Sequence, residues 1–144
     1  MTELAFNLAF PLAVPFWALM IVAPGWHWTR TIAGSPLIVL APLAAYLFAV
    51  VPILPEFAAE MVSPSFTGVR EIVSTADGTA LVWAHLIAFD LFVGRWSWLE
   101  ARTRGVPAWV MAPVLLLTIL LGPLGLLAYL ALRPRWPIPA TPGA

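Results

Sequence analysis

The chain contains no cysteine and no lysine, and each absence excludes a kind of chemistry. Without cysteine it cannot form disulfides, thiolate nucleophiles, iron–sulfur clusters or covalent c-type haem. Because every basic residue is arginine, no retinal or pyridoxal Schiff base can form on the chain. The net charge is zero and no basic run occurs, so the chain lacks the electrostatic footprint of a nucleic-acid-binding protein.

Charged residues are also scarce, at 10% of the 144 residues, against roughly 25% in an average soluble domain. The hydrophobic fraction is 62%, which exceeds the soluble average of roughly 45–50%. The composition therefore predicts an integral membrane protein. Eight tryptophans, most of which flank apolar runs, are typical of the aromatic belt at a membrane surface.

Four apolar stretches approach the length of about 20 residues that a membrane-spanning helix needs. They are residues 4–23, 35–54, 79–98 and 108–132. We expect an all-α bundle of four transmembrane helices, kinked at prolines, that forms one domain over residues 1–135. A flexible, proline-rich tail is expected over residues 136–144. The first stretch lacks a positive flank, which favours a first span over a cleaved signal peptide.

The segment between the second and third stretches alternates acidic and apolar residues. It contains Glu56, Glu60, Glu71 and Asp77. This pattern predicts short amphipathic helices that lie at the membrane surface. Four spans would place three arginines on one side of the membrane (Arg70, Arg133 and Arg135) and four on the other (Arg30, Arg95, Arg102 and Arg104). Such an even division does not decide the orientation.

The third stretch contains "WAHLIAFDLFVGRW", residues 83–96, in which three ionisable residues are spaced five apart: His85, Asp90 and Arg95. Five positions of a helix advance a side chain by about 140°, so the three groups point in different directions at three depths. Asp90 falls near the membrane midplane, where a charge costs roughly 2.5–3.5 kcal/mol or more. We therefore expect Asp90 to be buried against protein, water or a counter-charge.

Each of the three ionisable groups has a functional and a structural interpretation. Asp90 is either a reactive acid or a hydrogen-bonding partner of a neighbouring helix. His85 is either a proton carrier or a structural histidine, and Arg95 either stabilises charge or extends to the membrane surface. The two histidines are too far apart to share a haem, and no ligand pair has metal-binding spacing. We therefore predict no metal and no cofactor.

Two further patterns predict a binding surface near Asp90. Pro123, with Gly122 and Gly125 beside it, should break the fourth helix near the depth of Asp90 and leave room for a ligand or for close packing. His85, Phe89, Phe92 and Trp96 fall within about 40° on one helical face. This aromatic stripe either lines a site for an apolar molecule or packs against another helix.

The stretches "HLIAFDLFVGRW" and "LLTILLGPLGLLAYLALR" resemble the ABA4-like (abscisic-acid-deficient-four) family of small membrane proteins. In plants, members of that family are required to make the allenic carotenoid neoxanthin from violaxanthin. The resemblance transfers the motif onto a defined set of residues: His85, Asp90, Gly94, Arg95, Gly122, Pro123 and Gly125. The first span begins close to Met1 without a plastid transit peptide, which favours a bacterial member in an inner or photosynthetic membrane.

The resemblance implies a role with a carotenoid or another apolar isoprenoid, within a lipid bilayer. One hypothesis is a redox-neutral epoxy-carotenoid isomerase without a cofactor, in which Asp90 and His85 transfer protons and Arg95 stabilises charge. The alternative is a non-catalytic pigment-binding or scaffold protein whose charges hold the helices together. A small transporter with Asp90 in a proton path is a third hypothesis. So small a bundle is also expected to form a homo-oligomer or join a larger membrane complex.

Overall fold

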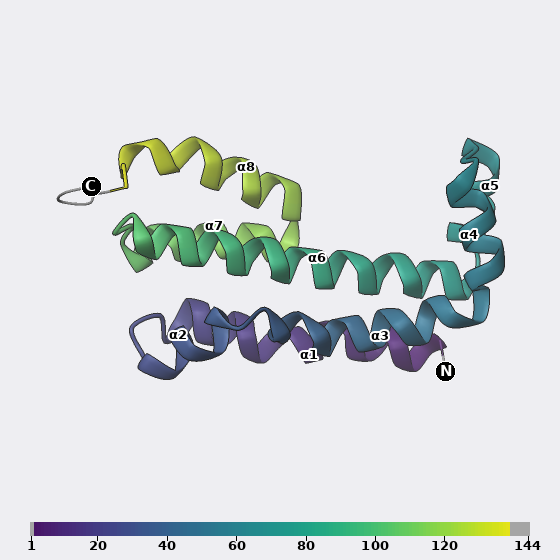
Figure 1. The fold of residues 1–144 in the computed structure, drawn as a ribbon, viewed down its shortest axis with the longest axis horizontal. Coiled ribbons are helices and arrows are strands. Elements are labelled where there is room, and N and C mark those ends of the chain that lie inside the picture. Colours follow the sequence, from purple (N-terminus) through teal and green to yellow (C-terminus); the bar gives the residue numbers. More distant parts are fainter. Residues whose placement is uncertain (1, 139–144) are drawn as a thin grey trace, which may run out of the picture. The chain divides into compact units, whose positions relative to one another are not determined.

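The computed structural model describes residues 2–138, and within this range the chain is helical and contains no strand. It has eight α-helices and three short 3₁₀ segments (Figure 1). They are α1 (Thr2–Val22), α2 (His27–Gly34), η1 (Pro36–Val39), α3 (Leu40–Val50), η2 (Val51–Ile53), α4 (Leu54–Val62), α5 (Phe66–Ser74), α6 (Ala76–Thr103), α7 (Ala108–Leu120), α8 (Gly122–Leu132) and η3 (Arg133–Arg135). The all-α prediction is confirmed. Most of the tail predicted to be flexible, residues 139–144, lies outside the described residues.

Three helical segments of the described chain are long and apolar enough to cross a membrane: Thr2–Val22, Pro36–Val62 and Ala76–Thr103. They coincide with the first three predicted spans. The third of them, α6, has 28 residues and is therefore roughly 42 Å long, about the full thickness of a bilayer with its headgroups. Asp90 lies at the middle of α6. The predicted kinks in the first two spans are not confirmed: α1, for example, continues as one helix through Pro11 and Pro15.

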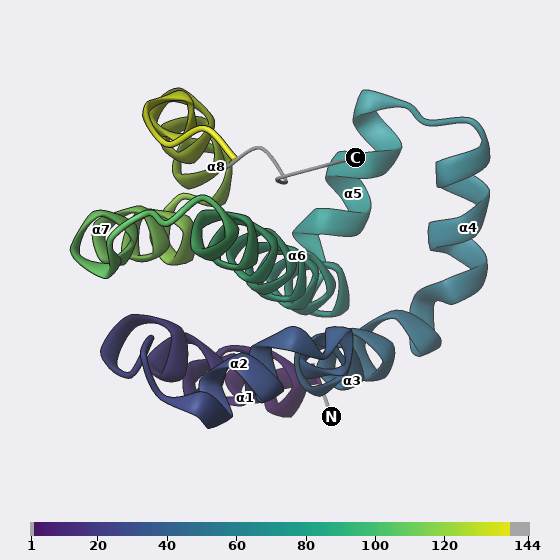
Figure 2. The same cartoon turned by 60° about the vertical axis from the view of Figure 1, so that its left-hand side comes forward.

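The predicted fourth span over residues 108–132, with a break at Pro123, is not confirmed as one crossing, because two helices cover these residues. The helix stops at Leu120, Leu121 adopts non-helical angles (φ −148°, ψ 66°), and α8 begins at Gly122. The chain then reverses, and α8 returns beside α7 (Figures 1 and 2). The Nη1 atom of Arg104, before α7, donates a hydrogen bond to the carbonyl of Trp136, after α8, at 3.2 Å.

The reversal has two causes in the sequence. Pro123 has no N–H group with which to continue the helical hydrogen bonds. Gly125 has no side chain, which lets the start of α8 approach Thr118 of α7. With 13 residues, α7 is roughly 20 Å long, too short to cross a hydrocarbon core of about 30 Å. We refer to α7 and α8 together as the α7–α8 hairpin.

The chain packs into two compact units. Unit 1 comprises residues 1–15 and 37–89, and unit 2 comprises residues 16–36 and 90–144. A core in unit 1 is built around small and branched side chains from α1, α3 and α6: Ala5, Ala49, Val50, Ala80 and Leu81. Alanines let membrane helices approach closely, which compensates for the weak hydrophobic drive between helices in lipid.

The region predicted to be amphipathic, after residue 54, forms two short helices of unit 1, α4 and α5 (Figure 2), of which α4 is the last part of the segment Pro36–Val62. Ser65 caps α5, because its side chain accepts a hydrogen bond from the backbone N–H of Gly68 at 3.0 Å. Glu60 of α4 accepts hydrogen bonds from the backbone and the side chain of Ser65. The connection between the two helices is therefore held by side-chain hydrogen bonds.

Unit 2 is held together by side chains of α6 that reach backbone carbonyls. Trp98 donates from Nε1 to the carbonyl of Met20 at 3.2 Å. Arg102 donates from Nη1 to the carbonyl of Pro24 at 2.8 Å. Gly94 lies directly against the ring of Trp17, where any larger residue would collide. These contacts join α6 to α1 and to the residues that follow it.

The hairpin makes a testable prediction about membrane sidedness. Because the chain has no cysteine, single cysteines can be introduced at Thr31 and Ile138, which are both exposed in unit 2. We expect a membrane-impermeant maleimide to label both positions from the same side of sealed vesicles, because α7 and α8 together return the chain to its starting side. Permeabilised vesicles provide the control for reactivity. Labelling from opposite sides would show that residues 108–132 cross the membrane.

Candidate functional site

Asp90 lies opposite the break between α7 and α8. Its carboxylate is in contact with Gly122, in the space that the β-carbon of any other residue would occupy. Gly122 is buried, and Asp90 is more exposed than Gly122 but still partly buried. The prediction that the break lies near the depth of Asp90 is confirmed. The missing side chain at Gly122 is what allows the acid to approach the backbone.

The start of α8 is a favourable place for an acidic group. A helix N-terminus carries a partial positive charge from its unpaired N–H groups, which attracts a carboxylate. Pro123 has no N–H, and the N–H groups of Leu124 and Gly125 bond to the carbonyl of Leu121 at 2.8 and 3.1 Å. The Asp90 carboxylate therefore lies where the start of α8 favours a negative charge.

The second glycine, Gly125, allows α8 to pack closely against α7. It faces Thr118 of α7, whose hydroxyl is buried and donates to the carbonyl of Val114 at 2.8 Å. A side chain at Gly125 would collide with both the backbone and the hydroxyl of Thr118. Of the two predicted purposes for these glycines, ligand approach and packing, the structure shows packing at Gly125.

The side chain of His85 has different surroundings from that of Asp90. It is exposed and belongs to unit 1, where its ring stacks on Phe89 (centroids 5.2 Å apart) and approaches Tyr46 (5.9 Å). A proton-transfer pair in which both Asp90 and His85 are buried is therefore not confirmed. In the described chain no charged residue is fully buried, and Asp90 is partly exposed while its carboxylate lies against the backbone at Gly122. Within a bilayer, a group exposed at mid-helix faces lipid or a bound molecule.

Arg95 has a structural partner that the sequence did not reveal. Its Nη2 atom donates to the carbonyl of Gly34 at 2.6 Å, and its Nε atom donates to that of Ser35 at 3.2 Å. These carbonyls lie at the end of α2, where a positive group is electrostatically favourable. Arg95 thus anchors α2 to α6. Its role in stabilising charge during a reaction stays a prediction.

The aromatic stripe of α6 faces outward. His85, Phe89, Phe92 and Trp96 are all exposed, whereas Leu91 on the opposite side of the helix is fully buried. Trp96 meets the ring of Tyr129 of α8 edge to face, with centroids 5.6 Å apart. The predicted helical face is therefore confirmed as an exposed face of α6. Gly94 is not part of this surface, because it is buried against Trp17.

Tyr129 and Glu100 form a polar cluster that sequence reasoning missed. Glu100 Oε1 pairs with Arg104 at 2.7 Å and with Arg133 at 3.4 Å. The Tyr129 side chain is 1% exposed, and its hydroxyl interacts with the Glu100 carboxylate but lies outside good hydrogen-bond geometry. The spacing of Glu100 and Arg104 was the available signal, since oppositely charged residues four apart meet on a helix.

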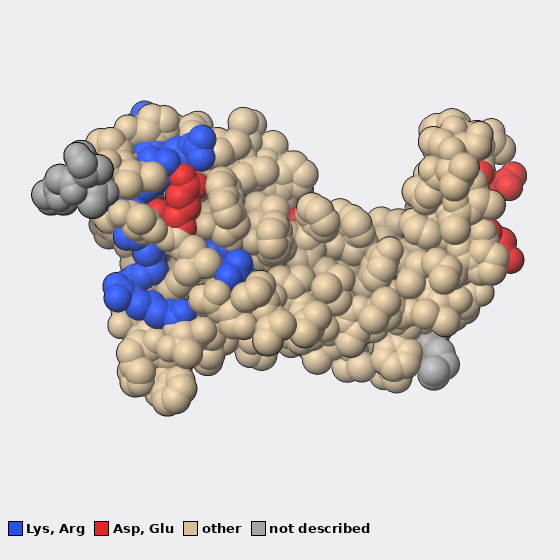
Figure 3. Space-filling model, viewed as in Figure 1, with Lys and Arg blue, Asp and Glu red and all other residues tan. Residues whose placement is uncertain are grey.

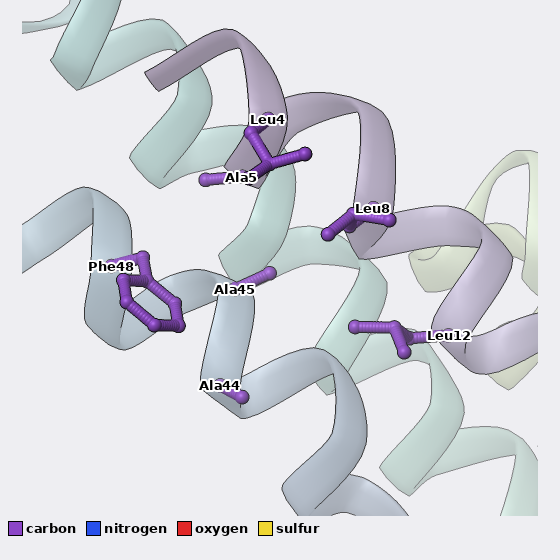
Figure 4. A pocket seen from close by; sticks show the side chains of 7 residues that line it. All are labelled: Leu4, Ala5, Leu8, Leu12, Ala44, Ala45 and Phe48. Carbon is purple, nitrogen blue, oxygen red and sulfur yellow. The ribbon is translucent and has the colours of Figure 1, made fainter. Parts of the chain in front are cut away.

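Unit 1 contains an apolar pocket of about 100 Å³ between α1 and α3 (Figure 4). It is lined only by aliphatic and aromatic side chains: Leu4, Ala5, Leu8, Leu12, Ala44, Ala45 and Phe48. With no polar group in its wall, the pocket suits an apolar chain and has no means of proton transfer. Among residues 2–138, no three His, Asp or Glu side chains gather as metal ligands would.

The fold and the site together define the class of protein. It is an α-helical membrane protein with apolar helices long enough to cross a bilayer and with a helical hairpin, α7–α8, that has one acidic residue at its break. The chain belongs to the ABA4-like family (ABA DEFICIENT 4-like), whose sequence profile matches residues 4–129. Membership implies a carotenoid-related role at the level of the family. No curated protein and no solved structure matches the chain.

The contact between Asp90 and Gly122 can be tested by a double-mutant cycle. Gly122→Ala should lower the free energy of unfolding in detergent by about 1–3 kcal/mol, because the new methyl group displaces the carboxylate. Gly25→Ala is the matched control, since nothing lies within 4 Å of its added methyl group.

In an Asp90→Ala background, the cost of Gly122→Ala should fall by at least about 0.5 kcal/mol, because the colliding atoms are gone. Equal costs in the two backgrounds would mean that Asp90 and Gly122 are not in contact.

Proposed function

We propose that this protein acts on a carotenoid or a related isoprenoid as a redox-neutral isomerase, with Asp90 as the principal proton-transfer group. The observation that carries the proposal is the position of Asp90, which is partly exposed at the centre of a spanning helix. An ionisable group at this depth is costly and marks a functional site by default. Family membership supports a carotenoid as the substrate class.

The outward stripe of α6 supports an elongated apolar substrate. From His85 to Trp96 the helix rises by 11 residues, which is roughly 16 Å. The rings of Phe89, Phe92 and Trp96 are each more than a third exposed, so a rod-like polyene dissolved in the bilayer can lie along them. Such a substrate would reach the helix from the membrane rather than from water.

The isomerisation of an epoxide to an allenic alcohol needs only proton transfer. An acid protonates the epoxide oxygen as its C–O bond breaks, and a base removes a vinylic proton, so that atoms and electrons balance without an oxidant or a reductant. Asp90 would supply the proton. The start of α8 would then stabilise the carboxylate that remains.

His85 is the second proton-transfer group of the proposal. It lies on the stripe itself, stacked on Phe89, five residues before Asp90 on the same helix. Its side chain is exposed. Arg95 ranks behind both residues, because its guanidinium group is already bonded to two carbonyls.

A non-catalytic role is the second candidate, and the contact with Gly122 favours it. If Asp90 only supports the α7–α8 hairpin, its removal should destabilise the protein whatever the substrate. The same charge-bearing residues would then hold a pigment-binding or scaffold protein together. Stability and activity therefore have to be measured on the same variants.

The enzyme hypothesis predicts a loss of conversion in Asp90→Asn. The purified protein is incubated in detergent with an epoxy carotenoid, and the pigments are separated by chromatography. General acid catalysis contributes about 10²–10⁴-fold, so the variant should be slower by at least about 100-fold. Glu71→Gln, an exposed acid of α5, should convert as fast as the native chain.

Thermal unfolding in detergent separates the two candidate functions. An Asp90→Asn variant that melts like the native chain but lacks activity supports a catalytic acid. A variant that converts the pigment at the native rate would remove Asp90 from the mechanism. Absence of any new pigment with the native chain would contradict the isomerase itself.

A further inference from the structure

The arginines of the chain are concentrated in unit 2. Six of the seven belong to it, against two acids, Asp90 and Glu100. The six are Arg30, Arg95, Arg102, Arg104, Arg133 and Arg135. Figure 3 shows arginine atoms gathered over one region of this unit. The hairpin contributes to this concentration, because it returns Arg133 to the neighbourhood of Glu100 and Arg104.

The two acids of unit 2 do not neutralise this charge. Glu100 is engaged by Arg104 and Arg133, and Asp90 lies at the break before α8. Arg95, Arg102 and Arg135 donate to backbone carbonyls, which carry no net charge. Several guanidinium groups of unit 2 therefore have no acidic partner among the described residues.

Arg30 and Arg102 are brought together by the residues between α1 and α2. Arg102 donates to the carbonyl of Pro24, and Thr29 donates to the neighbouring carbonyl of Ala23 at 2.7 Å. Arg30, the next residue after Thr29, therefore lies in the same part of unit 2 as Arg102. A pair of like charges at a membrane surface is stabilised by an anion that bonds to both.

The surroundings of this pair are those of a membrane surface. Trp26 and Trp28 are 50% and 51% exposed, and tryptophan prefers the headgroup level of a bilayer. Thr29 and Ala33 are buried on the inner side of α2, which leaves Arg30 on its exposed side. Arg102 also lies over the ring of Trp98, 5.1 Å from its centroid, which holds its guanidinium group in place.

We propose that the phosphate of an anionic phospholipid binds between Arg30 and Arg102, in the cytoplasmic leaflet. Guanidinium groups are suited to phosphate, because their N–H groups form paired, charge-assisted hydrogen bonds. Anionic lipids attract basic residues close to the cytoplasmic membrane surface, and loops rich in arginine remain on that side. The inference does not depend on the proposed carotenoid chemistry.

The test compares lipids of different charge on the full chain in detergent. Phosphatidylglycerol or phosphatidylcholine is added to the micelles, and bound lipid is measured by native mass spectrometry. The native chain should retain phosphatidylglycerol in preference to phosphatidylcholine. One arginine near a membrane surface strengthens the binding of an anionic lipid about fivefold. Arg30→Gln should therefore weaken retention of phosphatidylglycerol about fivefold, and the double variant Arg30→Gln with Arg102→Gln about 25-fold.

Arg70→Gln is the matched control, because Arg70 is an exposed arginine of α5 in unit 1. It should retain phosphatidylglycerol like the native chain. Thermal melting in phosphatidylcholine shows whether each variant is folded. If Arg102→Gln unfolds, Arg30→Gln still tests the site, because Arg30 is exposed. An equal loss in Arg70→Gln, or none in Arg30→Gln, would overturn the site.

Two further measurements can overturn the proposal. If inorganic phosphate displaces the lipid at equal concentration, the site is one for free phosphate and not for a lipid. A cysteine at Thr31, beside Arg30, should be protected from an impermeant maleimide in spheroplasts and labelled after lysis. Labelling in intact spheroplasts would place Arg30 outside the cytoplasmic leaflet.

Discussion

The interruption of a helix within the membrane is the constraint on which the rest of the structure depends. A helix end leaves backbone N–H and C=O groups without partners, and lipid supplies none. Here the carbonyl of Leu121 accepts from two N–H groups of the first turn of α8, and Asp90 lies against Gly122. The break is thus satisfied locally, and the chain is able to reverse direction at Leu121 and return.

The reversal then determines where charge lies. It brings the residues after α8 beside the end of α6, so that Arg133 can join the pair that Glu100 forms locally with Arg104, and the carbonyl of Trp136 can accept from Arg104. Arg133 and Arg135 thereby join the four arginines that precede the hairpin in unit 2, so that this unit contains six of the seven arginines. The reversal at Leu121 therefore brings Gly122 against Asp90 and Arg133 towards the other arginines of unit 2. The first contact concerns the proposed enzyme, and the second concerns the proposed lipid site.

Prediction succeeded where a property is local to one segment. Apolar runs located the first three spans, because length and hydropathy alone decide whether a helix can cross a bilayer. Helical periodicity correctly separated His85, Asp90 and Arg95 around α6, and the Gly-Pro motif correctly indicated a break at the depth of Asp90. Prediction failed for residues 108–132, since a proline produces either a kink or a full reversal, and hydropathy is the same for both.

By itself, the amino-acid sequence determined the membrane class, the three spans, the amphipathic α4 and α5, and the central position of Asp90, because each follows from composition or from periodicity along one helix. Only the tertiary structure decided that α7 and α8 form a hairpin, that Arg95 anchors the end of α2, and that Tyr129 lies by Glu100. These features depend on contacts between residues far apart in the chain. Gly122 and Gly125 permit close contacts because they have no side chains. The packing of the helices determines that their neighbours are Asp90 and Thr118.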